Sequence, residues 1–302
     1  LLPRGVMFAN YTQLLQLFIV AVALFCRAGM VEIALLQVIP LVIIACIALK
    51  DLNCRFPQYQ IASVKEFDSI LAREFVRPSL HFFSMQMSQL ISLQGSVFVV
   101  GALFGGVQVV MFTTIRTLVG VARQFLNTLT HSAWPEMTRL DIEDRAMLFR
   151  LFRRILRTTL LGTLGLLILL HFAGPYVYRL WLGDQISYQS RLTDLFLFYL
   201  LLSTFWTACS HLLMSTNNHR VLSRVVLISS LLSLVFSFIG GRKYGLDGVV
   251  CGMIVGDLVL PFWIVQYLLS KYDSGFSLKF FCFEAIPAFV IACAILIIPT
   301  AG

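Results

Sequence analysis

The sequence is a succession of apolar runs, each about as long as a helix that crosses a bilayer. Such a helix needs about 20 mostly apolar residues. The nine runs are residues 11–26, 30–49, 80–103, 106–130, 155–173, 193–214, 221–240, 246–270 and 280–299. Only 13% of the 302 residues are charged, against about 25% in a typical soluble domain. The pattern predicts an all-α, polytopic transmembrane helix bundle of about nine spans. Because the sequence starts at Leu1 and stops directly after an apolar run, we expect a fragment, or a chain trimmed at both ends.

Basic residues are divided unevenly between the two sets of alternating loops. Sixteen of the 23 Lys and Arg residues lie on one side, five lie on the other, and Arg116 and Arg123 lie inside a run. The positive-inside rule assigns the richer side to the cytoplasm. This distribution accounts for the net charge of +8, so we expect no nucleic-acid partner.

Two of the predicted cytoplasmic connections are long. Residues 51–79 contain a capping box of Ser63 and Glu66 followed by apolar residues at helical spacing, which predicts an amphipathic helix on the inner leaflet. Residues 134–157 begin with Trp134 and Pro135 and continue into an arginine-rich face. Topology and attraction to anionic lipids, worth about 1 kcal/mol per basic residue, explain that face. Specific recognition of a lipid headgroup is the alternative.

The run 106–130 holds two arginines inside a predicted span. Its polar residues are spaced three and four apart and therefore share one helical face. They are Thr113, Arg116, Gly120, Arg123, Asn127 and Thr130. A central arginine costs about 2.5–3.5 kcal/mol on the insertion scale, so this face should meet protein or water. Either the arginines pair with buried acids or carbonyls, or reach toward an interface, or they line a wet cavity and bind an anion, since guanidinium suits phosphate.

Neighbouring runs carry further polar stripes that are predicted to border the same cavity. With the arginines they would bind a sugar phosphate, and the predicted binding residues are Arg116, Arg123, Asn127, Ser84, Ser88, Gln86, Gln89, Trp206 and Thr207. Small and hydroxylated residues also hold helices together in lipid. That structural role remains the alternative for each stripe.

The run 246–270 combines a glycine pattern with a buried acid. Gly248, Gly252 and Gly256 recur at spacing four, which is typical of close helix packing. Asp257 is the only acid deep inside a predicted span. Such an acid is either a proton or cation site, here a candidate for ion coupling, or the structural partner of an arginine.

The sequence contains no recognisable catalytic or metal-binding motif. HExxH, GxSxG and phosphate-binding glycine loops are missing, and the seven cysteines show no CxxC or Cys/His spacing. We therefore predict no enzyme, no cofactor and no metal site. The histidines near predicted span ends are expected to be solvated or to lie at helix ends. These are His131, His171, His211 and His219.

Three segments in a fixed order resemble polysaccharide-export flippases of the MOP superfamily, the Wzx-type transporters of O-antigen or capsule repeat units. They are WPEMTRLDIEDRAMLFRLFRR at 134–154, STNNHR at 215–220 and YGLDGVVCGMIVGDLVLP at 244–261. The resemblance extends over about residues 1–270 and implies two six-helix lobes that face each other across a cavity. It assigns residues 1–50 to the last two helices of the first lobe and 51–79 to the cytoplasmic connection. It assigns 80–270 to the second lobe and 271–302 to an additional C-terminal helix.

The resemblance also implies a function. Such proteins translocate undecaprenyl-pyrophosphate-linked oligosaccharide across the bacterial cytoplasmic membrane by alternating access, for lipopolysaccharide or capsule biosynthesis. Arg116 and Arg123 would engage the pyrophosphate, and Asp257 would be a candidate for ion coupling. Expected partners are the lipid-linked oligosaccharide, membrane lipids, and the glycan polymerase and glycosyltransferases of the same pathway. A cation-coupled multidrug exporter of the same superfamily and a membrane glycan polymerase or ligase remain alternatives.

Overall fold

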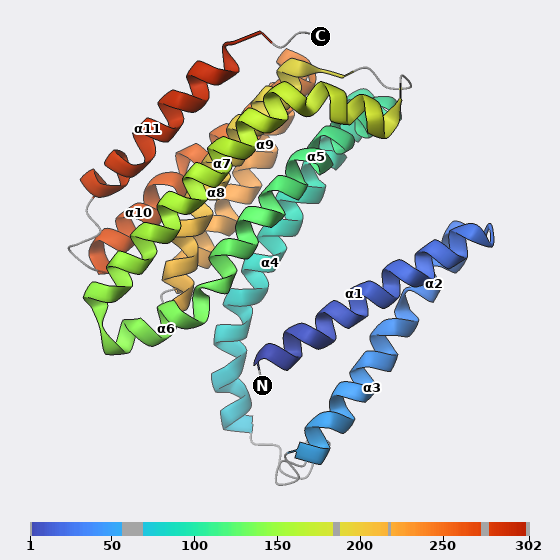
Figure 1. Cartoon of the computed structure of the whole chain (residues 1–302), viewed down its shortest axis with the longest axis vertical. Coiled ribbons are helices and arrows are strands. Elements are labelled where there is room, and N and C mark those ends of the chain that lie inside the picture. Colours follow the sequence, from blue (N-terminus) through green and yellow to red (C-terminus); the bar gives the residue numbers. More distant parts are fainter. Residues whose placement is uncertain (1, 56–68, 184–187, 217–218, 273–277, 300–302) are drawn as a thin grey trace. The chain divides into compact units, whose positions relative to one another are not determined.

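Helices form nearly the whole structure. The computed structural model describes residues 2–55, 69–183, 188–216, 219–272 and 278–299, which form eleven α-helices and no strand (Figure 1). The helices are α1 Leu2–Phe25, α2 Met30–Leu36, α3 Val38–Arg55, α4 Ser69–Phe104, α5 Gly106–Ser132, α6 Trp134–Glu143, α7 Arg145–Leu182, α8 Ser190–Ser215, α9 His219–Val259, α10 Pro261–Tyr272 and α11 Leu278–Leu296. The prediction of an all-α chain is confirmed for these residues. They divide into two compact units, Leu1–Ala72 and Arg73–Gly302.

Seven of the described helical stretches are long and apolar enough to cross a membrane, and Asn10–Phe25 is a shorter apolar helix. A multi-pass membrane protein follows from their length and composition. The number of about nine spans and the division into lobes stay predictions. The capping box of Ser63 and Glu66 lies outside the described residues.

The first unit is built from α1, α2 and α3, with α1 packed against both of the others. The predicted run 30–49 forms two helices that break at Gln37. Pro40 explains the break, because proline lacks an N–H and its ring clashes with the carbonyl four residues earlier. The Gln16 side chain donates a hydrogen bond of 3.1 Å to the carbonyl of Gln37, which ties α1 to the break.

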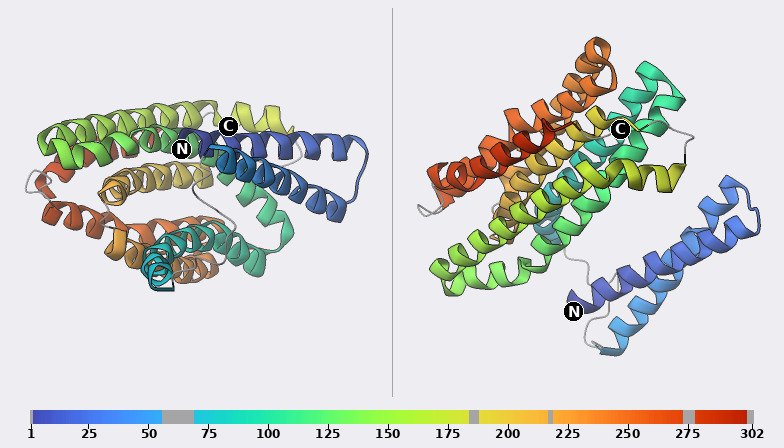
Figure 2. Two further views of the ribbon diagram at one scale, coloured as in Figure 1. Left: turned by 90° about the horizontal axis from the view of Figure 1, so that it is seen from below. Right: turned by 45° about the horizontal axis from the view of Figure 1, so that its top comes forward.

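The central helix of the second unit is α8. It contacts α5, α7, α9 and α10, and Figure 2 (left) shows it in gold between the green helices and the orange ones. Its side chains are buried along almost its full length, as expected for a helix that is apolar on all sides. Buried hydroxyls of α8 donate to carbonyls of their own helix, as Thr204 does to Leu200 at 2.6 Å.

The long helix α9 is a hairpin of two antiparallel arms, which can be followed in Figure 2 (right). The chain reverses near Gly245, whose φ of 70° lies in the left-handed region that favours glycine. Across the hairpin, Ser229 donates to the carbonyl of Gly256 at 3.0 Å, and Ser237 donates to that of Val249 at 2.9 Å. We call residues 219–244 the first arm and residues 246–259 the second arm.

The glycine pattern of the second arm has the role that the sequence predicts. A Cβ added at Gly252 would lie 2.2 Å from the backbone nitrogen of Ser237, and one at Gly248 would lie 2.0 Å from the carbonyl oxygen of Gly240. Side chains larger than hydrogen are therefore excluded at these positions. A Cβ added at Gly256 would likewise lie 2.5 Å from the Cβ of Ser233. The predicted close packing of Gly248, Gly252 and Gly256 is therefore confirmed.

One end of the second unit is rich in arginine and is held together by polar contacts. The helix α7 starts ten residues before the predicted run 155–173, because Asp144 caps it by accepting the backbone N–H of Met147 at 2.9 Å. The hydroxyl of Tyr272 on α10 donates to Asp141 on α6. The guanidinium of Arg145 lies 5.6 Å from the centre of the Tyr272 ring. The start of α7 and the end of α10 therefore meet at this end.

A candidate anion-binding cavity

A cavity of about 250 Å³ lies within the second unit, between α4, α5, α8 and both arms of α9. Its polar lining consists of hydroxyls, amides and aromatic rings with one arginine and one aspartate. These residues are Ser88, Gln89, Ser92, Arg123, Gln124, Asn127, Tyr199, Ser203, Trp206, Thr207, Ser210, His211, Ser229, Ser230 and Asp257. The volume is slightly below the roughly 300–1,000 Å³ of typical small-molecule pockets.

The α5 wall of the cavity is the polar face that the helical period predicts. Gly120, Arg123 and Asn127 all line the cavity. No other atom lies within 4 Å of the Cβ position of Gly120, so the space beside Arg123 stays open. Within the described part of the chain, the partly buried Arg123 forms no ion pair with a carboxylate. The guanidinium can therefore meet a ligand.

Arg116 has a different environment although it lies on the same helical face. Its Nη1 donates to the backbone carbonyl of Leu93 on α4, and it does not line the main cavity. Arg116 and Arg123 both border an adjoining recess of about 30 Å³, which Tyr199 also lines. Of the two interpretations from the sequence, pairing with a carbonyl describes Arg116 and a cavity position describes Arg123.

Asp257 lies in the cavity wall on the second arm and is 5% exposed. Its carboxylate accepts the Trp206 indole N–H at 3.0 Å, and the Tyr199 hydroxyl interacts with it as well. Arg123 acts on Asp257 electrostatically from beyond ion-pair distance. The carboxylate therefore orients the indole, and its charge stays close to that of the arginine without being locked to it.

The other predicted binding residues fall into two groups. Ser88, Gln89, Trp206 and Thr207 line the cavity. Ser84 lies on the side of α4 that faces the first arm, where its hydroxyl is 3.5 Å from the carbonyl oxygen of Ser223. Gln86 is exposed on α4. Neither Ser84 nor Gln86 belongs to the cavity lining.

The expectation that the histidines are solvated or lie at helix ends is wrong for His171, which is buried well inside α7, whereas His211 lies near the end of α8 but is buried. His211 is 6% exposed, lines the cavity, and its Nδ1 lies 2.9 Å from the hydroxyl of Thr130. The His131 ring stands 4.4 Å from that of His211. His171 is 1% exposed, and its Nδ1 lies 2.7 Å from a carboxylate oxygen of Asp194. Histidines at the ends of apolar runs become buried where helices from distant parts of the chain cover them.

Among the described residues, no group of His, Cys, Asp or Glu side chains is arranged to hold a metal ion. The chain matches no known family model, no curated protein and no solved structure. The chemistry of the site therefore rests on its own residues. One unpaired guanidinium, three amides, several hydroxyls and an oriented indole can bind a ligand that carries both an anionic group and hydroxyl groups.

Proposed function

We propose that the chain moves an anionic, lipid-linked glycan across the bacterial cytoplasmic membrane, with the cavity holding part of its polar head. The observation that carries the proposal is Arg123, a guanidinium within a candidate span that faces a polar cavity. A charged residue inside the hydrocarbon layer raises the free energy of membrane insertion, and such residues usually have a function. A phosphate oxygen pair is its best geometric partner, and undecaprenyl-pyrophosphate-linked oligosaccharide is the proposed substrate.

The remainder of the cavity lining supports a glycan next to the phosphate. Gln89, Gln124 and Asn127 supply donors and acceptors from two helices, which suits sugar hydroxyls. The Trp206 ring, fixed through its N–H by Asp257, offers a flat apolar surface for a sugar ring. The cavity volume of about 250 Å³ fits the phosphate-proximal part of such a molecule, and the rest must extend outside.

The outer faces of α4 and α5 support a lipid tail. On α5, Val121 and Phe125 lie two residues before and after Arg123, on the opposite side of the helix from the cavity, and are 68% and 63% exposed. Leu90 on α4 is 49% exposed. An apolar surface of this kind is compatible with acyl chains, so a tail can stay in the bilayer while the charged head enters the protein.

Binding can be measured through Trp206, one of four tryptophans. Purified protein in detergent is titrated with undecaprenyl-pyrophosphate-linked oligosaccharide, and the emission change is expected to disappear in Trp206→Phe. Arg123→Gln should weaken binding at least about tenfold, because hydrogen bonds to charged groups contribute about 1.5–3 kcal/mol each. Arg154→Gln is the matched control, since Arg154 is exposed on α7 and outside the cavity.

Transport is tested in cells that lack their own flippase. The Arg154→Gln variant should restore surface glycan, whereas Arg123→Gln should fail although it reaches the membrane at the normal level. Full glycan production with Arg123→Gln, together with unchanged binding, would contradict the proposal. Arg116→Gln should reduce binding less than Arg123→Gln does, because Arg116 donates to the carbonyl of Leu93 outside the main cavity.

A second candidate function has support from Asp257. A buried carboxylate beside Trp206 and Tyr199 also suits an organic cation, through its charge and through cation–π contacts. The chain would then be a cation-coupled drug exporter. Asp257→Asn separates the two functions. It should abolish drug efflux in an exporter, whereas a glycan flippase should keep binding its substrate through Arg123.

A further inference from the structure

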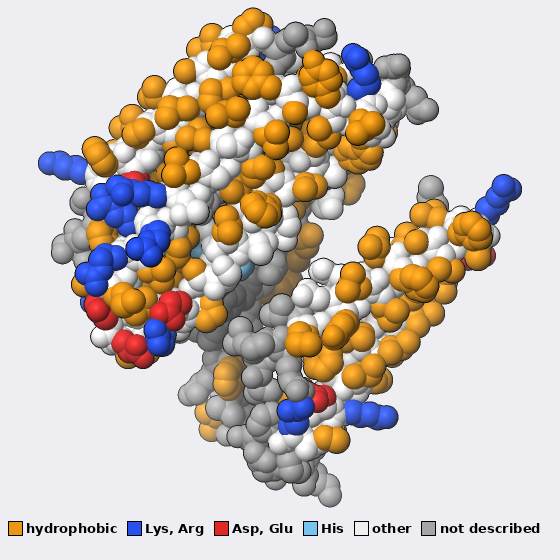
Figure 3. All heavy atoms as spheres, viewed as in Figure 1, with side chains coloured by type: hydrophobic (Ala, Val, Ile, Leu, Met, Phe, Trp, Pro, Cys, Tyr) orange, Lys and Arg blue, Asp and Glu red, His pale blue; other side chains and the backbone are white. Residues whose placement is uncertain are grey.

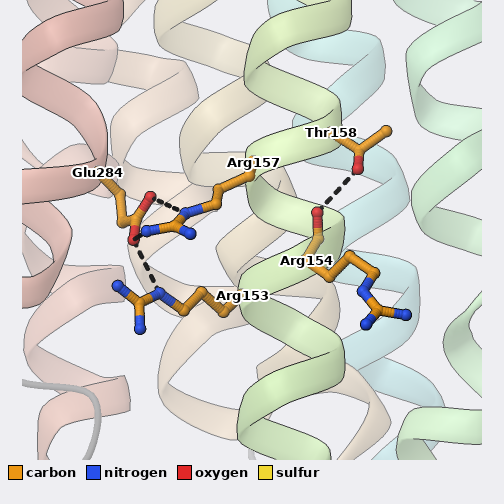
Figure 4. A network of polar contacts seen from close by, with 5 residues as sticks. All are labelled: Arg153, Arg154, Arg157, Thr158 and Glu284. Atoms are coloured by element: carbon orange, nitrogen blue, oxygen red, sulfur yellow. Dashed lines mark hydrogen bonds and ion pairs between the residues drawn. The ribbon is translucent and has the colours of Figure 1, made fainter.

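A second charged site joins α7 and α11, outside the cavity. Both carboxylate oxygens of Glu284 on α11 accept from Arg157, with Nε at 2.7 Å and Nη2 at 2.7 Å. The Nε of Arg153 donates to the same carboxylate at 3.0 Å. Figure 4 shows both arginines reaching from α7 to Glu284, whereas Arg154 points away from it. The arrangement is a fork of two cations on one anion.

The fork has charge and donors left over. Two guanidiniums against one carboxylate leave a net positive charge. A guanidinium carries several N–H donors in a plane, and only three N–H groups of the pair donate to Glu284. The side chains of Arg153 and Arg157 are 40% and 48% exposed, whereas that of Glu284 is 6% exposed. The Glu284 carboxylate is therefore buried in its contacts with the two arginines, whereas the remaining guanidinium N–H groups are accessible from outside.

The residues around the fork are of the types found at the depth of lipid headgroups. It lies near the start of α11 and close to the α6–α7 end, where basic side chains gather in Figure 3. The guanidinium of Arg153 lies 5.5 Å from the centre of the Phe280 ring. On α11, Phe283 and Ile286 are 70% and 57% exposed next to Glu284. Basic groups, an aromatic ring and exposed apolar side chains therefore occur together, as at a membrane interface.

We propose that the Arg153–Arg157–Glu284 fork binds the headgroup of an anionic phospholipid. The phosphodiester of phosphatidylglycerol accepts from the free N–H groups of the two arginines, and its acyl chains lie along the exposed apolar residues of α11. Glu284 holds the guanidiniums in place, which reduces the rotamer freedom that lipid binding would otherwise remove. A zwitterionic phospholipid brings a cation of its own to this positive site and binds less well.

Native mass spectrometry of the whole chain in neutral detergent micelles tests the proposal. Micelles remove the general attraction of a charged bilayer surface, so only contacts at the site remain. The first phosphatidylglycerol molecule should bind more tightly than phosphatidylcholine. Arg153→Gln should weaken it at least about tenfold, the factor expected for the loss of one hydrogen bond to a charged group, while the bidentate Arg157–Glu284 pair keeps α11 docked. Arg154→Gln is the matched control and should change the affinity less than about twofold.

Three results would overturn the proposal. One is an equal loss of affinity in Arg153→Gln and Arg154→Gln, which would indicate unspecific attraction. Another is displacement of the lipid by inorganic phosphate at matched concentration, which would identify a free anion as the ligand. The last is a failure of Arg153→Lys, which keeps the charge, to recover most of the binding, because the loss would then reflect structural damage. None of these measurements depends on the function of the cavity.

Discussion

The α9 hairpin allows a stability prediction whose magnitude follows from interatomic distances. We expect Gly252→Ala to lower the free energy of unfolding by about 2–4 kcal/mol. The new Cβ would lie 2.2 Å from the backbone nitrogen of Ser237 and 2.4 Å from its Cα. Both are backbone atoms, so no side-chain rotation can relieve the clash. The arms must separate by at least roughly 0.8 Å to reach the 3.0 Å below which Cβ contacts essentially never occur.

The magnitude has two parts. Overpacking of a close-packed interface costs about 1–3 kcal/mol. Separation also weakens the hydrogen bonds from Ser237 to Val249 and from Ser229 to Gly256, which measure 2.9 Å and 3.0 Å. Hydrogen bonds between helices in membrane proteins contribute about 0.6 kcal/mol each on average. Together these contributions give the expected range.

The assay is equilibrium unfolding of the purified protein in mixed detergent micelles. Gly165→Ala is the matched control, because no other atom lies within 4 Å of the Cβ position of Gly165 on α7. This control should be neutral or stabilising by up to about 1 kcal/mol, since alanine favours helix more than glycine does. If Gly252→Ala is as stable as Gly165→Ala, the two arms do not pack as closely as their distances require.

The same assay checks three further changes. Gly245→Ala should cost about 1–3 kcal/mol through its backbone conformation alone, since a φ of 70° with a ψ of −150° is adopted essentially only by glycine and no atom beyond its chain neighbours lies within 4 Å of its Cβ position. His171→Ala should cost about 1–3 kcal/mol, since the Asp194 carboxylate and the Ile298 carbonyl would lose the imidazole that contacts both. Glu284→Gln should lower the unfolding temperature by a few degrees, because two arginines of α7 lose their carboxylate. An unchanged transition would contradict the backbone strain inferred at Gly245, or the contacts of His171 or Glu284 that the other two changes remove.

Much of the cavity could be predicted from helical spacing. On α5 the period of three and four residues placed Arg123 and Asn127 on one polar face, and both line the cavity. The same rule assigned Arg116 to the cavity although its guanidinium donates to the carbonyl of Leu93. The two arginines are seven residues apart, so spacing within one helix cannot separate their roles. The burial of His211 could not be predicted from the sequence either. It is buried against α5, whose Thr130 is 81 residues earlier in the chain.

The sequence alone determined that the chain is helical and suited to a membrane, because run length, hydropathy and helical period are local properties. It also determined where glycine allows helices to approach closely. Only the tertiary structure decided which polar groups meet. Trp206 and Asp257 are 51 residues apart, and Arg157 and Glu284 are 127 residues apart. Such pairs depend on how whole helices pack and rotate against one another, and a pattern within one helix carries no information about its neighbours.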